Sequence, residues 1–195
     1  GNRGVEGKII TCRYARENNI PYLGICLGMQ VAVIEYARDV LGLKDANSGE
    51  FDPDSKNKVI DFLPDQSDNI NKGGTLRLGA YPCKVEFGSK LYECYNEEMI
   101  FERHRHRYEY NNDYREQLVN AGLLIGGTSP DERIVETVEI KENDYFVGVQ
   151  FHPEFKSRPN KPHPLFTGLI RYAALRKERL EGVTGNGETA EENDK

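Results

Sequence analysis

A cysteine stands between two glycines in residues 24–28, which read GICLG. Apolar residues precede this segment and a helical pattern follows it, so Cys26 is expected at a sharp turn from a strand into a helix. The pattern is glycine-x-nucleophile-x-glycine, whose turn is too tight for a Cβ at the glycines. A helix N-terminus favours a thiolate, and the N–H of Leu27 can donate to an oxyanion. A buried structural cysteine at a strand–helix junction is the alternative.

A histidine and a glutamate lie two positions apart in residues 150–155, which read QFHPEF. In an extended backbone His152 and Glu154 point the same way. Glu154 can then hold one imidazole nitrogen while the other faces a thiol, which is an arrangement of nucleophile, base and orienting group. A surface His-Pro turn with a solvated glutamate is the alternative. The glycine-flanked cysteine and this pair together favour catalysis over either alternative.

The elements around these residues predict how they are positioned. Residues 5–19 and 28–41 show helical patterns, and residues 22–25 form a short apolar run between them. Residues 145–151 are rich in β-branched and aromatic side chains and predict the strand that leads to His152. We therefore predict an α/β fold with a mainly parallel sheet, helices on both faces and the nucleophile at the carboxyl end of a strand.

The C-terminal region divides into a helix and a tail. Residues 165–180 are amphipathic and end in cationic side chains, which suits a helix C-terminus. Residues 181–195 contain three glycines and five carboxylates with little to bury. We expect one domain over residues 1–180 and a disordered acidic tail over residues 181–195. Because the chain opens at Gly1, we also expect it to begin inside a longer polypeptide.

Composition excludes several classes of protein. The 195 residues suit one domain, and no apolar run approaches the roughly 20 residues of a membrane span. The net charge of −6 argues against a general nucleic-acid binder. Beside Cys26, the cysteines Cys12, Cys83 and Cys94 are too irregularly spaced for a disulfide framework or a zinc site, so we interpret them as packing residues. Free thiols and the lack of a signal peptide predict a cytoplasmic protein.

A basic segment, residues 103–107, alternates arginine and histidine as RHRHR. An extended backbone would place the three arginines on one face and His104 and His106 on the other. A nucleic-acid patch and a metal site are weaker interpretations, because the chain is acidic and no third metal ligand is evident. Ion pairs or interdomain contacts are favoured for most of these side chains. His163, between two prolines, is interpreted as a loop residue.

Residues 21–30 (PYLGICLGMQ) and 148–155 (GVQFHPEF) closely resemble the class I glutamine amidotransferases. Three further stretches resemble one branch of that family more narrowly: residues 73–79 (GGTLRLG), 102–109 (ERHRHRYE) and 162–166 (PHPLF). The resemblance covers nearly everything from residue 1 to about residue 175, and it implies a flavodoxin-like α/β fold.

The resemblance also implies roles for individual residues. Cys26 matches the nucleophile, His152 the general base and Glu154 the residue that orients the base. The positions that match glutamine-binding and oxyanion residues are Leu27, Gly28, Met29, Gln30, Glu50 and Arg107. Glu50 would receive the substrate α-ammonium and Arg107 would clamp the α-carboxylate. The segment around Glu50 reads ANSGEF where the family has ANSTEF, so Gly49 departs from the pattern.

The implied reaction is glutamine hydrolysis through a cysteine thioester. In this branch the ammonia serves the ATP-dependent amination of UTP to CTP, a step of pyrimidine nucleotide synthesis. The resemblance implies a synthetase domain that binds UTP, ATP and Mg²⁺, activation by GTP, and a homotetramer at full length. Residues 73–79 resemble the mobile lid that the family associates with this activation. No cofactor, metal, nucleic acid or membrane is expected on this chain itself.

The family begins this domain with further strands and a glycine-rich P-G-G-F-G segment that completes the oxyanion hole. We expect the chain to lack them, and hence to be a poor glutaminase in isolation. Two alternatives stay open. One is the glutaminase of another class I amidotransferase, such as a GMP synthase. The other is a non-catalytic fragment that contributes assembly contacts.

Overall fold

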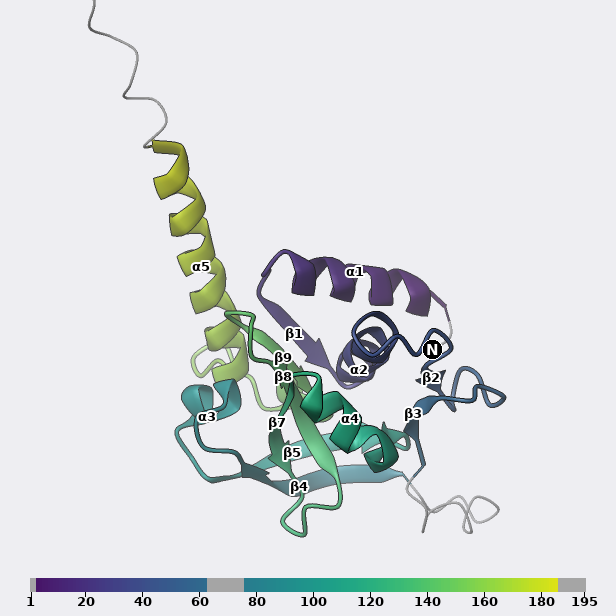
Figure 1. Cartoon of the computed structure of the whole chain (residues 1–195). Helices are drawn as coiled ribbons and strands as arrows, with labels where there is room; N and C mark the ends of the chain where they lie inside the picture. The colour runs from purple at the N-terminus through teal and green to yellow at the C-terminus, as the bar shows by residue number, and fades with distance from the viewer. Residues whose placement is uncertain (1–2, 63–75, 186–195) are drawn as a thin grey trace, which may run out of the picture.

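The computed structural model describes residues 3–62 and 76–185, with the backbone alone for residues 183–185. Figure 1 shows the helices packed around a curled sheet. The elements in chain order are α1 (Val5–Glu17), β1 (Tyr22–Ile25), α2 (Leu27–Asp39), β2 (Asn47–Ser48), β3 (Lys58–Asp61), β4 (Arg77–Val85), α3 (Lys90–Tyr95), β5 (Met99–His106), β6 (Glu109–Tyr110), η2 (Asn112–Tyr114), α4 (Arg115–Asn120), β7 (Leu123–Thr128), β8 (Val135–Ile140), β9 (Phe146–Val149), η3 (Pro153–Phe155) and α5 (Pro164–Gly185).

The main sheet has the strand order β1-β9-β8-β7-β4-β5. Only β1 and β9 pair in parallel, whereas the other described neighbours are antiparallel. The prediction of a mainly parallel sheet is therefore wrong for these strands. The reason is the length of the connections: residues 129–134 and 141–145 are too few for a crossover, so β7, β8 and β9 run back and forth. The α/β class itself is confirmed.

Helices cover both faces of this sheet, as predicted. Successive residues of β9 point to opposite faces. Phe146 packs into the core formed with α1 and α2, whereas Val147 and Val149 pack into a second core with Leu91 of α3 and Leu165 of α5. Figure 1 shows α1 and α2 lying together, with α3 and α5 grouped apart from them. The strand that leads to His152 is thus held from both sides.

A second, three-stranded sheet has the order β2-β3-β6. Asn47 and Ser48 of β2 pair in parallel with β3, and Ile60 and Asp61 of β3 pair antiparallel with β6. Since β6 follows β5 closely in the chain, this sheet ties the loop after Ser48 to the end of β5. Glu50 is therefore placed beside the basic segment, although about 55 residues separate them in sequence.

The C-terminal helix is longer than predicted. α5 continues to Gly185, so residues 181–185 are helical and not part of a disordered tail. Lys177 and Glu181, one helical turn apart, approach to 3.5 Å and support this extension. Figure 1 shows α5 projecting away from the sheet. The rest of the predicted tail, residues 186–195, and residues 73–75 of the GGTLRLG segment lie outside the described residues.

Among the helices of the described residues, none is long and apolar enough to cross a membrane.

Candidate active site

Cys26 occupies the sharp turn between β1 and α2 that the sequence predicts. Its backbone has φ 51° and ψ −102°, a left-handed conformation that is costly for a residue with a Cβ. A Cβ on Gly24 would lie 2.6 Å from the backbone carbonyl of Gly28, so glycine is required there. At Gly28 an added Cβ would meet only the Tyr22 hydroxyl, at 3.7 Å. The predicted steric need for glycine thus holds at Gly24 and is wrong at Gly28.

The pairing of β1 with β9 brings the two motifs together. Ile25 lies opposite Val149 in a parallel register, and the Cys26 N–H donates to the Val149 carbonyl at 2.7 Å. The carboxyl ends of β1 and β9 therefore lie side by side at one edge of the sheet. Gln150 and His152 therefore follow β9 at the same edge where Cys26 follows β1.

His152 and Glu154 form the predicted pair, but on a different backbone. Nδ1 of His152 lies 2.6 Å from Oε1 of Glu154. The segment is not extended, because Pro153 begins the one-turn helix η3, and the carboxylate returns to the ring across this turn. The imidazole ring stacks on Phe155 with centroids 5.0 Å apart. The backbone N–H of His152 donates to the backbone carbonyl of Arg103.

This pairing sets the chemistry of the imidazole. When Nδ1 donates to Glu154, a neutral ring carries its lone pair at Nε2. Nε2 of His152 is buried and has no hydrogen-bond partner among the described residues. The ring therefore offers a free acceptor, as a general base requires.

A cavity of about 290 Å³ opens beside the cysteine. Its walls combine apolar, basic and acidic side chains: Cys26, Leu27, Gln30, Glu50, Phe51, Leu76, Arg105, His106, Arg107 and Tyr108. Five predicted site residues meet here, from three separate parts of the chain. His152 and Glu154 stand at the adjoining strand end and are not wall residues. A small polar molecule suits a cavity of this size and lining.

Two predicted contact residues do not line this cavity. Met29 is fully buried and packs into the core beneath α2. The Gly28 carbonyl accepts a hydrogen bond from the Tyr22 hydroxyl at 2.8 Å, which fixes the first turn of α2. Both residues therefore shape the turn, and the prediction that they contact substrate finds no support in the wall of the cavity.

Opposite charges face the same cavity. Glu50, Arg105 and Arg107 are exposed residues, and all three line it. Neither arginine forms an ion pair within the described residues. A guanidinium fork matches a carboxylate in two hydrogen bonds, and a carboxylate matches an ammonium group. The walls are thus complementary to a free amino acid, which carries both charges.

Burial dominates the acidity of Cys26. It raises the pKa of the thiol from 9.0 to about 11. Hydrogen bonds from the Leu27 amide and the Gln150 side chain act in the opposite direction, while Glu154 and Glu50 add to the increase. The prediction that the helix N-terminus makes this cysteine a thiolate is outweighed by desolvation. The thiol needs a base to become a nucleophile.

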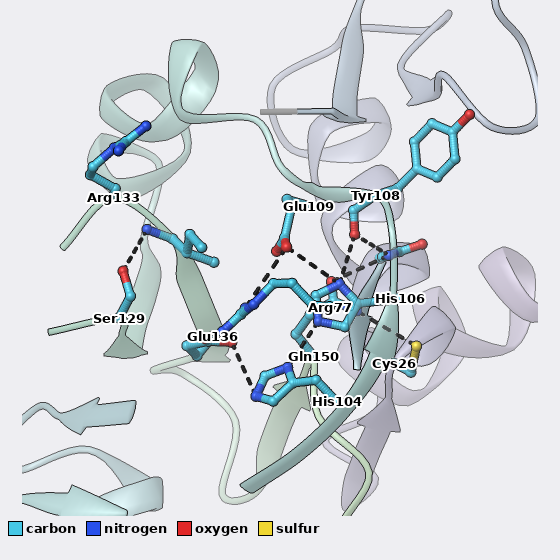
Figure 2. A network of polar contacts seen from close by, with 12 residues as sticks. Cys26, Arg77, His104, His106, Tyr108, Glu109, Ser129, Arg133, Glu136 and Gln150 are labelled. Atoms are coloured by element: carbon cyan, nitrogen blue, oxygen red, sulfur yellow. Dashed lines mark hydrogen bonds and ion pairs between the residues drawn. The ribbon is translucent and has the colours of Figure 1, made fainter. Parts of the chain in front are cut away.

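Behind the cavity lies a buried polar network that sequence reasoning missed. Figure 2 shows Gln150, His104 and His106 leading from Cys26 toward Arg77 and two glutamates. The alternation predicted for residues 103–107 is confirmed: the arginines are exposed and both histidines are buried. Nδ1 of His104 lies 2.8 Å from Nε2 of His106. Within the described residues, no group of three or more His, Cys, Asp and Glu side chains could hold a metal ion.

The sequence held one signal of this network, a glutamine at the end of an apolar strand. Gln150 follows a run of hydrophobic residues and directly precedes the catalytic motif. A polar side chain there must be buried, and buried amides need partners.

Comparisons with known proteins agree with this geometry. The family model described as "Glutamine amidotransferase class-I" matches residues 1–172. CTP synthase of Caldanaerobacter subterraneus subsp. tengcongensis is 63% identical over 171 residues, covering 88% of this chain and 32% of the relative. CTP synthase of Bacillus subtilis is 62% identical over 170 residues, covering 87% and 32%. The chain spans about a third of the length of these curated relatives.

A solved structure gives the same result. The glutaminase domain of Trypanosoma brucei CTPS, solved with bound acivicin, is 44% identical with a TM-score of 0.83, covering 89% of this chain and 67% of that one. The chain therefore belongs to the class-I glutamine amidotransferase family. Within it, the chain is the glutamine amidotransferase domain of a CTP synthase, and the GMP synthase alternative is wrong.

Proposed function

We propose that this chain hydrolyses glutamine at Cys26 and that the ammonia aminates UTP to CTP in an ATP-dependent reaction. The observation that carries the proposal is the parallel pairing of β1 with β9, which puts Cys26 beside the strand end that bears His152 and Glu154. The charged walls of the adjoining cavity support an amino acid as the substrate.

Substrate binding follows from the charges. Arg107 binds the α-carboxylate and Glu50 binds the α-ammonium group, so the side-chain amide of glutamine extends toward Cys26. Gln30 lines the same cavity and positions that amide. Because both charged residues are exposed in the free chain, they bind without first breaking an ion pair within the described residues.

The reaction has two halves. His152 Nε2 removes the proton from Cys26, and Sγ attacks the amide carbon while the Leu27 N–H donates to the oxyanion. The C–N bond breaks as His152 returns its proton to nitrogen, leaving a thioester and ammonia. His152 then removes a proton from water, which attacks the thioester carbon. The C–S bond breaks, glutamate leaves, and His152 returns the proton to Sγ. Glu154 stabilises the imidazolium at each stage.

The larger reaction involves groups beyond these residues. We propose that a synthetase domain binds UTP, ATP and Mg²⁺, that GTP activates glutamine hydrolysis, and that the full enzyme is a homotetramer. The share of each curated relative that this chain leaves unmatched is compatible with such a domain. The cysteines of the chain are all free, which suits the cytoplasm.

The deciding experiment separates the two nitrogen sources. In the enzyme that joins this chain to a synthetase domain, Cys26→Ala should abolish CTP synthesis from glutamine and preserve synthesis from added ammonia. Glutamine-dependent synthesis that survives the substitution would contradict the proposal and favour a non-catalytic role for this chain. Cys94→Ala is the matched control, because Cys94 does not line the cavity and packs instead in the core beside α5.

A further inference from the structure

A buried side-chain amide contacts the nucleophilic sulfur. Gln150 is fully buried, and its Nε2 lies 3.6 Å from Sγ of Cys26. Its Oε1 lies 3.2 Å from Nε2 of Gln30. Figure 2 shows Gln150 between Cys26 and the buried histidines. The chemistry of this contact depends on which end of the amide faces the sulfur, because NH₂ donates a hydrogen bond and the oxygen accepts one.

A backbone carbonyl decides the orientation. Gln30 Nε2 lies 3.1 Å from the carbonyl oxygen of Tyr108, which can only accept a hydrogen bond. Gln30 must therefore present its NH₂ group at that end, and the same group faces Gln150. Gln150 in turn must present its oxygen to Gln30, which leaves its own NH₂ group facing Sγ. Two successive hydrogen bonds thus force a donor onto the sulfur.

The carbonyl that sets this order is itself held. Nδ1 of His106 lies 3.3 Å from the Tyr108 oxygen, and Nε2 of His106 lies 2.8 Å from Nδ1 of His104. Burial and the nearby charge of Arg77 lower the pKa of His104 to about 2 and that of His106 to about 3. Both rings are neutral, and each carries its proton on Nδ1.

Gln150 is also fixed through its backbone. Its N–H donates to the carbonyl of Glu136 at 2.8 Å, and the Glu136 carboxylate accepts from Arg77 at 2.8 Å. Arg77 of β4 and Glu136 of β8 thus form a buried charged pair. The side chain of Gln150 is therefore positioned by contacts at both ends.

We propose that Gln150 is a catalytic residue whose side-chain N–H donates to Sγ of Cys26 and stabilises the thiolate formed when His152 removes its proton. Gln30 is the positioning residue that fixes the direction of the Gln150 amide. The inference rests on the proposed function, since it concerns the same nucleophile. A donor to a charged sulfur strengthens as the negative charge develops, which is what lowers the barrier to attack.

Other charges also act on this thiol, so the test must separate them. Glu50 lies after β2, and Glu154 and His152 lie after β9. Arg105 and Arg107, at the end of β5, line the same cavity. Substitutions at Gln150 leave all five of these residues in place.

The test measures the rate at which iodoacetamide alkylates Cys26 as a function of pH, by mass spectrometry of the Cys26 peptide. Iodoacetamide reacts with the thiolate, and its reaction does not depend on glutamine binding. Gln150→Met, which keeps the length of the side chain and removes the donor, should slow alkylation by about tenfold or more at neutral pH. Gln150→Glu should slow it further, because it adds a negative charge beside the sulfur. Gln117→Glu, on exposed α4, is the matched control and should change nothing.

Two internal controls guard against misfolding. Cys12 and Cys83 are fully buried, so their alkylation reports loss of the fold in any variant.

Gln30→Met should slow Cys26 alkylation by less than Gln150→Met, because it frees the Gln150 amide to turn without removing it.

An unchanged rate and pH profile in Gln150→Met, with Cys12 and Cys83 still protected, would overturn the inference and leave the proposed function standing. Failure of the proposed function is read separately, from glutamine-dependent synthesis that survives Cys26→Ala.

Discussion

The two faces of the basic segment at the end of β5, residues 103–107, differ in charge: one carries exposed arginines and the other carries buried, neutral histidines. On the cavity face, Arg105 and Arg107 are exposed and carry no ion pair among the described residues. On the buried face, His104 and His106 bond to each other and are held neutral, and His106 also lines the cavity. One strand therefore keeps its cationic groups free for a ligand and uses its neutral groups to position the residues behind the nucleophile.

Behind the buried histidines lie ionisable groups whose electrostatic energies are coupled, because Arg77 lies close to both Glu136 and Glu109. Arg77 pairs with fully buried Glu136 at 2.8 Å, and Glu109 lies 3.8 Å from the same guanidinium. Neither carboxylate oxygen of Glu109 has a hydrogen-bond partner among the described residues. Such groups are costly to desolvate. Buried charge here therefore affects stability, whereas charge on the cavity face affects binding.

The largest effect should come from breaking the buried pair. Glu136→Leu leaves the Arg77 guanidinium buried without its main partner and should lower the free energy of unfolding by about 3–5 kcal/mol. Denaturant unfolding checks this, with Glu132→Gln as the control. Glu132 pairs with Lys84 on the surface, where solvent screens the attraction, so its substitution should change stability little. Equal losses from both substitutions would remove the distinction between the faces.

A change on the cavity face should affect binding and leave stability alone. Arg107→Ala removes the partner of the substrate α-carboxylate and should lower kcat/KM for glutamine, with a loss of transition-state stabilisation of about 2–5 kcal/mol and ammonia-dependent CTP synthesis retained. Arg103→Ala is the matched control, because Arg103 shares the exposed face but does not line the cavity. If ammonia-dependent synthesis fell as far as the glutamine reaction, Arg107 would be a structural residue.

Glu109 predicts a pH dependence of stability. Burial raises the pKa of this carboxyl from 4.5 to about 8, against the attraction of Arg77. Between these values the folded chain keeps a proton that the unfolded chain has lost, so stability falls as pH rises, by up to about 1.4 kcal/mol per pH unit. Glu109→Gln should remove this slope in unfolding experiments between pH 4.5 and pH 8. An unchanged slope would place its origin in another group.

The smallest effect tests the tight turn. Gly28→Ala should cost less than about 1 kcal/mol, because the added Cβ meets only the Tyr22 hydroxyl at an ordinary contact distance of 3.7 Å. Gly24→Ala should be far more harmful, since its Cβ would overlap the backbone of Gly28. Thermal unfolding of the two variants compares them directly, and a Gly28→Ala variant as damaged as Gly24→Ala would contradict this assignment.

Local pattern predicted a large part of this molecule. The turn at Cys26, the pairing of His152 with Glu154 and the alternating faces of β5 all depend on neighbours a few residues apart, which is the range that sequence periodicity reports. The placement of Glu50 beside Arg107 came from family resemblance, because a loop and a strand end far apart in sequence meet only through β2, β3 and β6.

What sequence could not supply depends on tertiary packing. Strand direction in the main sheet is set by which strands pair, and the antiparallel run of β7, β8 and β9 was therefore missed. The high pKa of Cys26 follows from burial by residues on other elements. Gln150 gains its role from Gln30 and from the Tyr108 carbonyl, contacts across 120 and 78 residues.

The central claim is that Cys26 is the nucleophile of a glutamine-binding site. Brief labelling with an electrophilic glutamine analogue, followed by peptide mapping, tests it most directly. We expect rapid modification of Cys26 alone, slowed in Arg107→Ala, because only this cysteine shares a cavity with Glu50 and Arg107 in the described part of the chain. Equal modification of Cys12, Cys83 or Cys94 in the folded protein would contradict it.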